Sequence, residues 1–262
     1  MTYAEAGVYL ENVLESRIES TTHSDISDER IRELVSGHEK ELFNALETTV
    51  FNSLDNYLGT GMTAKVKAYT VAFGESSVPM AIKYVVTPTE KTITAEQEHN
   101  VIKEVERMRM IEAVEIIHER RSKYIRVPHP YLYHTTESLQ LYGMELIDGV
   151  TLEQACAEGT LPSDMKEALQ KSQLTTVPEE ELNGYIKRFF ETMHQYCLHG
   201  DIKPRNIMVS REGILYVIDF GQSVMIHNIP AGAEEQLENL KEDEIRQTQL
   251  AVRQMLQKVL TG

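Results

Sequence analysis

The sequence HGDIKPRN at residues 199–206, followed by VIDFG at residues 217–221, decides the predicted fold of this 262-residue chain. Asp201 precedes Asn206 by five residues and Asp219 by eighteen. The interval between the two segments leaves room for one short hairpin, because two apolar runs flank a turn there. Polar residues at fixed spacing, each next to an apolar strand-like run, indicate a built site and not two chance turn tripeptides.

These two segments resemble the protein-kinase-like superfamily. HGDIKPRN stands where a protein kinase has its H-R-D-L-x-x-x-N catalytic loop, and DFG is present unaltered. The resemblance implies ATP and Mg²⁺ as cofactors, with Asp219 holding one Mg²⁺ on the phosphates and Asn206 a second. It also implies that Asp201 accepts or orients the proton of the substrate hydroxyl, with Lys203 beside the γ-phosphate.

An upstream segment, GTGMTAKV, resembles the kinase G-x-G-x-x-G-x-V loop that covers the phosphates of ATP. Gly59 and Gly61 match its first two glycines, Ala64 takes the third position, and Val66 matches the valine. Glycines let the backbone turn sharply and bring N–H groups close to phosphate oxygens. Lys83 follows in MAIK, which resembles the V-A-I-K strand, so it is expected to pair with the α- and β-phosphates.

A helix is predicted to begin near residue 95, because Thr94 and Gln97 have the spacing of a capping box. In kinases this helix carries a glutamate that orients the strand lysine, here Lys83. Two glutamates compete for that role, Glu98 and Glu104. The apolar residues at +3, +4 and +7 slightly favour Glu98, but the distance from Lys83 decides for neither.

Two further strands are predicted at residues 127–133 and 139–149. The second resembles the kinase hinge, in which backbone groups meet the adenine ring. The resemblance gives that role to Glu145 and Ile147, with Met144 lining the back of the pocket. A buried core methionine is the plainer interpretation of Met144, and the two do not conflict.

Residues 1–55 read as helices, because apolar residues recur at helical spacing with acidic residues between them. A polar break at residues 20–25 separates two runs, and Ser27 is a plausible N-cap for the second. We favour the interpretation that both helices pack on the rest of the fold. The alternative is a docking or regulatory element, since the extension precedes the nucleotide motifs.

The segment after DFG departs most from the family pattern. Only 41 residues follow Gly221, and they contain no A-P-E. Residues 151–170 and 184–198 read as helices, and residues 236–260 as one or two amphipathic helices. This architecture resembles atypical, minimal kinases, such as RIO-like kinases and small kinases that bacteria deliver into host cells.

The predicted fold class is α+β, with two lobes and ATP with Mg²⁺ between them. Residues 1–55 form an N-terminal helical extension, and residues 56–147 an N-lobe with a five-stranded sheet and one long helix. Residues 148–262 form a reduced helical C-lobe. A chain of this length can bury a sizeable core.

Composition excludes some classes of protein. The formal charge of −15 argues against nucleic acid as a partner, because phosphate binding requires a basic surface. The two cysteines, Cys156 and Cys197, lack C-x-x-C spacing and are expected to be reduced. The first residues resemble neither a signal peptide nor a membrane span, so a cytoplasmic location is expected. Delivery into a host cell cannot be read from the sequence.

The leading functional hypothesis is an ATP- and Mg²⁺-dependent serine/threonine protein kinase of atypical, minimal type. Lys203, two residues after Asp201, favours it over a small-molecule kinase resembling aminoglycoside or choline phosphotransferases. A third hypothesis is a nucleotide-binding regulatory scaffold. The expected partner is a protein substrate, docked through the N-terminal helices or through the acidic C-terminal helix from Glu234 to Glu244.

Overall fold

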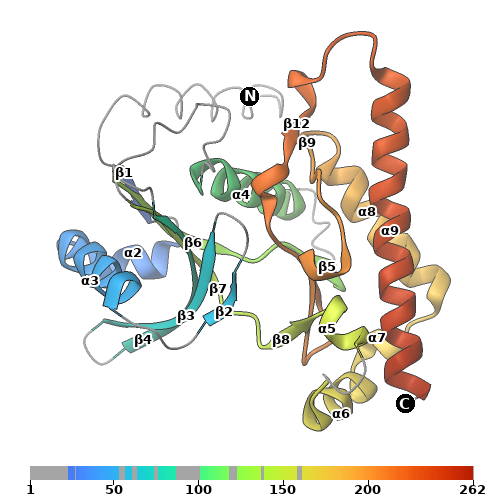
Figure 1. Cartoon of the computed structure of the whole chain (residues 1–262), viewed down its shortest axis with the longest axis horizontal. Helices are drawn as coiled ribbons and strands as arrows, with labels where there is room; N and C mark the ends of the chain where they lie inside the picture. The colour runs from blue at the N-terminus through green and yellow to red at the C-terminus, as the bar shows by residue number, and fades with distance from the viewer. Residues whose placement is uncertain are drawn as a thin grey trace. The chain divides into compact units, whose positions relative to one another are not determined.

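The computed structural model divides the chain into two compact units (Figure 1). One unit comprises residues 1–106 and 129–146, and the other residues 107–128 and 147–262. The division falls within helix α4 (Val101–Ile117), and each unit has β-sheet of its own. The structure describes residues 23–26, 28–52, 57–60, 64–73, 76–86, 101–117, 123–136, 139–157 and 161–261.

The first unit contains an antiparallel six-stranded sheet with the order β1-β6-β7-β4-β3-β2. Its strands are β1 (His23–Ile26), β2 (Tyr57–Thr60), β3 (Lys65–Phe73), β4 (Ser76–Val86), β6 (Pro130–Thr135) and β7 (Leu139–Glu145). In the register of the sheet, Lys83 on β4 lies between Val66 on β3 and Tyr142 on β7. The predicted strand lysine therefore occupies a central strand.

Strand β1 corrects one prediction, the five-stranded sheet, and it overlaps the polar break predicted between the two helical runs. Residues His23 to Ile26 pair antiparallel with β6 and form an edge of the sheet. Their side chains show no strand-like alternation, so the sequence alone did not predict a strand. Backbone groups along the edge of β6 provide the pairing, and such pairing does not depend on side-chain pattern.

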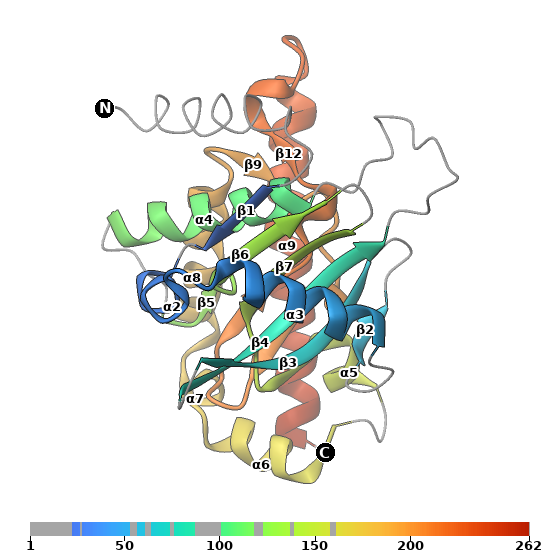
Figure 2. The same cartoon turned by 90° about the vertical axis from the view of Figure 1, so that its left-hand side faces the viewer.

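Helices α2 (Glu29–Val35) and α3 (Glu39–Asn52) pack against one face of this sheet (Figure 2). Asp28, one residue after the predicted cap, is the N-cap of α2 and accepts a hydrogen bond from the N–H of Ile31 at 3.1 Å. The shared core contains Ile31, Val35, Leu42, Phe43, Leu46 and Val50 from the helices with Val71, Met80, Ile82, Tyr84, Leu132, Leu139 and Leu141 from the sheet. The prediction that the second helical run packs on the body is confirmed for residues 28–52, and the first run lies outside the described residues.

The second unit is built on a four-stranded sheet with the order β5-β11-β10-β8. Its strands are β5 (Ile125–Arg126), β8 (Gly149–Thr151), β10 (Ile207–Ser210) and β11 (Leu215–Val217). The antiparallel hairpin of β10 and β11 confirms the hairpin predicted between Asp201 and Asp219. A second, two-stranded sheet pairs β9 (Cys197–Leu198) with β12 (Val224–Met225).

Helices make up most of the rest of this unit. They are α5 (Leu152–Cys156), α6 (Ser163–Lys171), α7 (Gln173–Thr176), α8 (Glu179–Met193) and α9 (Glu234–Thr261), with 3₁₀ turns η2 (Pro204–Asn206), η3 (Phe220–Gln222) and η4 (Ile226–Asn228). The single helix predicted at residues 151–170 is two helices, because Pro162 suits the start of a helix and breaks its interior.

Helix α9 is one continuous element, where the sequence predicted one or two helices. It packs against α5 and α8, and Figure 1 shows it running alongside α8. Its buried residues recur every three or four positions, as on the inner face of an amphipathic helix: Glu244, Thr248, Ala251, Val252, Met255 and Val259. None of the helices in the described part of the chain is long and apolar enough to span a membrane.

Candidate active site

The first unit holds a buried ion pair between Lys83 on β4 and Glu104 on α4. The Nζ atom of Lys83 lies 2.7 Å from Oε2 and 2.9 Å from Oε1 of Glu104. Tyr142 on β7 donates its hydroxyl hydrogen to Oε2 of the same carboxylate at 2.9 Å. Lys83 is 5% exposed and Glu104 is 1% exposed, so both charges depend on these hydrogen bonds.

Glu104 is therefore the partner of Lys83, and the slight preference for Glu98 is corrected. Glu98 lies outside the described residues. Glu104 lies in the first turn of α4, and Val101, Val105 and Met108 on the same helix are buried with it. A glutamate can reach Lys83 only if it lies on the buried face of α4. The number of residues between a glutamate and Lys83 does not show which face of the helix the glutamate is on.

The predicted phosphate loop is described in part. Gly59 belongs to β2, next to an irregularity in its pairing with β3, and lies opposite Val66. Ala64 is buried, which agrees with a small side chain at the third glycine position. Gly61 lies outside the described residues. A contact of these residues with phosphate stays a prediction.

The predicted hinge follows β7. Met144 is buried opposite Ala81, as the interpretation as a core residue requires. The backbone N–H of Glu145 donates to the carbonyl of His129 at 2.8 Å. An adenine contact at Glu145 would therefore have to use its carbonyl group. Ile147 is half-buried and lies past the end of the strand.

The second unit brings Asp201, Lys203 and Asn206 together. Asn206 donates its side-chain N–H groups to the carbonyl oxygen of Asp201 at 2.8 Å and to Oδ2 of Asp201 at 3.0 Å. Lys203 Nζ lies 2.5 Å from both carboxylate oxygens of Asp201. Asp201 and Lys203 are half-buried, so a substrate hydroxyl could reach the carboxylate.

Asn206 and Asp219 fit a magnesium site. The amide nitrogen of Asn206 is committed to Asp201, so its side chain can offer only its oxygen to a metal. Asp219 is exposed and has left-handed backbone angles, φ 66° and ψ 68°, which a non-glycine residue adopts mainly where surrounding structure enforces them. Mg²⁺ prefers such oxygen ligands and is commonly held by one or two carboxylates together with phosphates. Within the described residues, no three His, Cys, Asp or Glu side chains form a metal cluster.

His199 braces the catalytic loop through hydrogen bonds to the backbone. Its Nε2–H donates to the carbonyl of Ile218 at 2.9 Å, and its Nδ1 accepts the N–H of Asp201 at 3.3 Å. The ring also contacts that of Phe220, with centroids 4.8 Å apart. Burial lowers the pKa of His199, and a neutral ring is the form that can donate and accept in this way.

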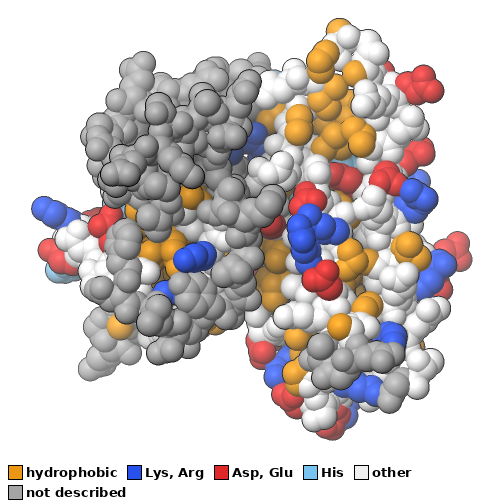
Figure 3. Space-filling model, viewed as in Figure 1, with side chains coloured by type: hydrophobic (Ala, Val, Ile, Leu, Met, Phe, Trp, Pro, Cys, Tyr) orange, Lys and Arg blue, Asp and Glu red, His pale blue; other side chains and the backbone are white. Residues whose placement is uncertain are grey.

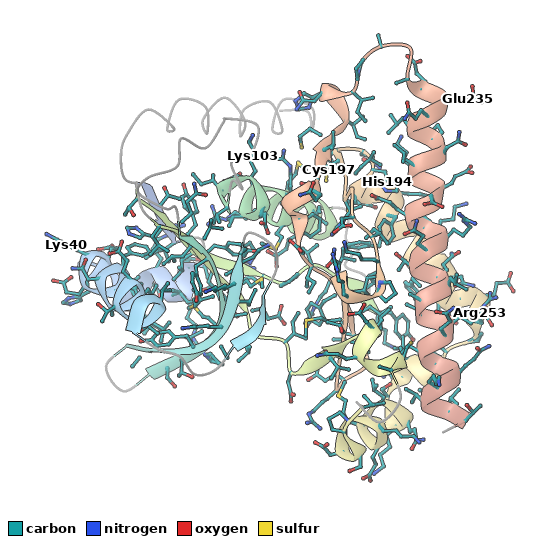
Figure 4. The ribbon with its side chains drawn as sticks, viewed as in Figure 1. Lys40, Lys103, His194, Cys197, Glu235 and Arg253 are labelled. Carbon is teal, nitrogen blue, oxygen red and sulfur yellow. The ribbon has the colours of Figure 1, made fainter. Side chains whose placement is uncertain are left out.

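The carboxylate of Glu244 on α9 holds the catalytic loop by accepting hydrogen bonds from the backbone of the loop. Sequence reasoning did not predict this role for Glu244. Its carboxylate accepts the N–H of Gly200 at 2.7 Å and the N–H of His199 at 3.2 Å. It also lies 2.8 Å from Nε2 of His194, which Figure 4 shows beside α9. Glu244 was predicted to belong to an exposed acidic surface, and that is wrong, because it is only 8% exposed. A carboxylate on the apolar stripe of an amphipathic helix was the signal in the sequence.

Gly200 stands where an ordinary protein kinase has arginine, and the structure explains the glycine. Its φ is +78°, in the left-handed region that side chains disfavour. A Cβ atom added here would lie 2.3 Å from the carbonyl oxygen of Gln222, far inside contact distance. Any side chain at this position would therefore displace the segment that follows DFG.

Comparison with known proteins agrees with this geometry. The family model described as protein kinase domain matches residues 53–238, well over half of the chain. CBL-interacting serine/threonine-protein kinase 18 of Arabidopsis thaliana is 26% identical over 140 residues, covering 49% of this chain and 24% of the relative. A probable serine/threonine-protein kinase of Dictyostelium discoideum is 30% identical over 131 residues, covering 48% and 28%. CBL-interacting protein kinase 19 of Oryza sativa is 28% identical over 172 residues, covering 66% and 28%. The matched region spans about a quarter of the length of these relatives.

Proposed function

The chain belongs to the protein kinase domain family, and from this premise we propose that it transfers the γ-phosphoryl group of ATP to serine or threonine hydroxyls of proteins. The observation that carries the proposal is the catalytic loop, where Asn206 and Lys203 both hydrogen-bond to Asp201. Such a loop can bind a hydroxyl and neutralise phosphate charge in one place. All three relatives are named as protein kinases, two of them as serine/threonine kinases, which supports this substrate class.

In the proposed reaction the substrate hydroxyl oxygen forms a bond to the γ-phosphorus while the bond from phosphorus to the β-phosphate oxygen breaks. Asp201 accepts the hydroxyl proton, and ADP leaves with the electron pair of the broken bond. Lys203 offsets negative charge on the γ-phosphoryl oxygens, and Lys83, held by Glu104, binds the α- and β-phosphates. Asn206 and Asp219 are the residues that would hold Mg²⁺, which would supply positive charge that offsets the charge of the phosphates.

We assign the protein to the atypical, minimal kinases because Gly200 replaces the arginine of regulated kinases. The same H-G-D sequence occurs in aminoglycoside and choline phosphotransferases, which makes a small-molecule kinase the second candidate. A cytoplasmic location fits the two cysteines of the chain, which are both free thiols. Protein substrates are the partners expected of this reaction.

The test is phosphoryl transfer from labelled ATP in the presence of Mg²⁺, to a panel of folded proteins and, separately, to aminoglycosides, choline and sugars. We expect label on protein serine or threonine. Lys83→Ala and Asp219→Asn should each lower the rate by about a hundredfold or more, since both residues act on charge that the substrate brings. Lys103→Ala removes an exposed lysine on α4, labelled in Figure 4, and is the matched control. Label on small molecules alone would favour the second candidate, and near-normal activity of Asp219→Asn would contradict both.

A further inference from the structure

The start of helix α4 turns one face into the interior of the first unit. Val101, its first residue, and Val105 are both fully buried, as is Glu104 between them. Residues three and four positions apart lie on the same side of a helix. Glu104 therefore reaches Lys83 only while this side of α4 stays turned toward the sheet.

Strand β7 directs alternate side chains to opposite faces of the sheet. Leu139 and Leu141 belong to the core that contains α2 and α3, so Gln140 and Tyr142 face the other way. Tyr142 lies opposite Lys83 in the register of β7 and β4. Gln140, two positions before Tyr142, is therefore on the same face of the sheet as Lys83.

Both of these β7 side chains hydrogen-bond to α4. Oε1 of Gln140 accepts the backbone N–H of Val101 at 3.2 Å, and the hydroxyl of Tyr142 donates to Oε2 of Glu104 at 2.9 Å. The two attachment points on α4 are about 4.5 Å apart along the helix axis, and the two on β7 are about 6.8 Å apart along the strand. A rotation of α4 by one residue position, about 100°, would break both bonds.

Two attachments restrain the helix more than one does. If Glu104 were the only point at which α4 is tied to the sheet by hydrogen bonds, the helix could still pivot about it. The bond from Val101 to Gln140 adds a second fixed point nearly one turn away. We propose that Gln140 is a positioning residue, which holds the start of α4 so that Glu104 stays in contact with Lys83.

The position of Glu104 matters more than that of a carboxylate at the surface. Figure 3 shows acidic and basic side chains spread over the surface of the second unit, where Lys171 and Glu167 form one of the exposed pairs. Separating such a pair costs little, because water solvates both charges. Lys83 and Glu104 are buried, so a displaced Glu104 would remove two hydrogen bonds from a buried ammonium group.

The consequence for catalysis rests on the proposed function. Lys83 is expected to bind the α- and β-phosphates of ATP, and a lysine whose partner has moved would no longer be held where those phosphates lie. Gln140 has no contact with nucleotide in this scheme. It acts on nucleotide only through Glu104 and Lys83.

The first test follows the amide hydrogen of Val101 by NMR hydrogen exchange, in the full chain without nucleotide. Gln140→Leu removes the acceptor oxygen and should speed this exchange at least about threefold, whereas Gln140→Glu keeps an acceptor oxygen and should not. Gln249→Leu is the matched control, because Gln249 is also half-buried and bonds at 3.2 Å to a backbone group of another helix, the carbonyl of Asn183. Unchanged exchange at Val101 in Gln140→Leu would overturn the proposal.

The second test measures binding of the fluorescent ATP analogue mant-ATP in the presence of Mg²⁺, without a protein substrate. Gln140→Leu should raise its Kd at least about threefold, and Gln140→Glu and Gln249→Leu by less than about twofold. In the Lys83→Ala background, Gln140→Leu should change the Kd no further, because it acts through Lys83. An equal further loss in that background would overturn the proposal.

Thermal unfolding of the same variants separates positioning from folding. A lower Tm of Gln140→Leu with an unchanged Kd for mant-ATP would assign Gln140 to stability alone and overturn the proposal. If the native sequence bound no mant-ATP, the proposed function would be contradicted. The exchange of the Val101 amide would still decide whether Gln140 holds α4, because that test contains no nucleotide.

Discussion

The hydroxyl of Tyr142 supports the buried pair of Lys83 and Glu104. A carboxylate that is 1% exposed needs each hydrogen bond it accepts, because burial removes the water that would otherwise solvate it. Tyr142 also belongs to the strand that leads to Met144. The tyrosine is therefore a positioning residue for Lys83 and acts through Glu104.

Tyr142→Phe should lower kcat about tenfold, because it removes one hydrogen bond to a buried charge and leaves the ring in place. Steady-state kinetics with varied ATP, together with thermal unfolding, check this. Tyr69→Phe on β3 is the control, since Tyr69 packs against the core on the sheet and not on Glu104. A loss of stability in Tyr142→Phe without a loss in kcat would assign the hydroxyl to structure alone.

His199 makes the stability of the protein depend on pH. Burial lowers its pKa in the folded state, whereas the unfolded chain has the ordinary value of about 6.5. Below that pH the His199 side chain binds a proton in the unfolded state more readily than in the folded state. Stability is therefore present above the unfolded pKa and falls as the pH drops toward the lowered native pKa.

We expect the free energy of unfolding to fall between about pH 7 and pH 5.5 by on the order of 1 kcal/mol more in the native sequence than in His199→Asn. Urea unfolding at both pH values measures the difference. Asparagine can still donate and accept hydrogen bonds but does not titrate. Identical pH dependence of the two proteins would mean that His199 is not kept neutral.

At the level of the element, α9 holds the loop that carries Asp201, although it follows that loop in the sequence. Glu244→Gln replaces the carboxylate that accepts two backbone N–H groups with an amide that offers one oxygen. It should destabilise the protein by ~1–3 kcal/mol and lower kcat more than it changes KM, since the loop positions Asp201. Glu191→Gln, an exposed carboxylate on α8, is the control for both kinetics and denaturation.

The segment after DFG is short, and its strand β12 is paired with β9. Residues 224 and 225 form β12 against β9, and η4 follows directly. Gly200 has no room for the arginine that pairs with a phosphorylated loop in regulated kinases. This geometry favours activity that needs no phosphorylation of the segment.

Protein made in bacteria and treated with phosphatase should therefore keep the activity of untreated protein. The comparison needs an assay with the folded protein substrate at equal enzyme concentration, and mass spectrometry to show that phosphate is gone. A drop of about tenfold or more on dephosphorylation, restored by incubation with ATP, would show that a phosphorylated residue is required after all.

At the scale of the whole molecule, the segment from β1 to α3 is part of the first unit's core. Leu46 is 1% exposed and packs in the cluster that holds β4, β6 and β7. Leu46→Ala should cost about 2–5 kcal/mol of unfolding free energy, because it leaves a cavity in a shared core. Urea unfolding followed by circular dichroism checks this, with the exposed Asn44→Ala as control. If the urea midpoint of Leu46→Ala were unchanged, the packing of α3 would not contribute to the stability of the sheet.

Much of the site followed from the sequence. The HGDIKPRN segment, DFG and the hairpin between them were predicted at the residues where the structure has them, because each of these patterns is contained in a few consecutive positions. The strand that carries Lys83 was predicted for the same reason. The glycine at position 200 was visible in the sequence. The reason that a side chain does not fit there, the closeness of the Gln222 carbonyl oxygen, was not.

Tertiary structure decided the pairings between distant residues. Glu104 meets Lys83 because the packing of α4 turns this glutamate toward the lysine. Glu244 reaches the catalytic loop across 44 and 45 residues of chain, and β1 joins the sheet through backbone groups of β6. Local patterns report which residues share a face of a helix or strand. They carry no information about which other element that face meets, because that depends on how all the apolar faces are buried together.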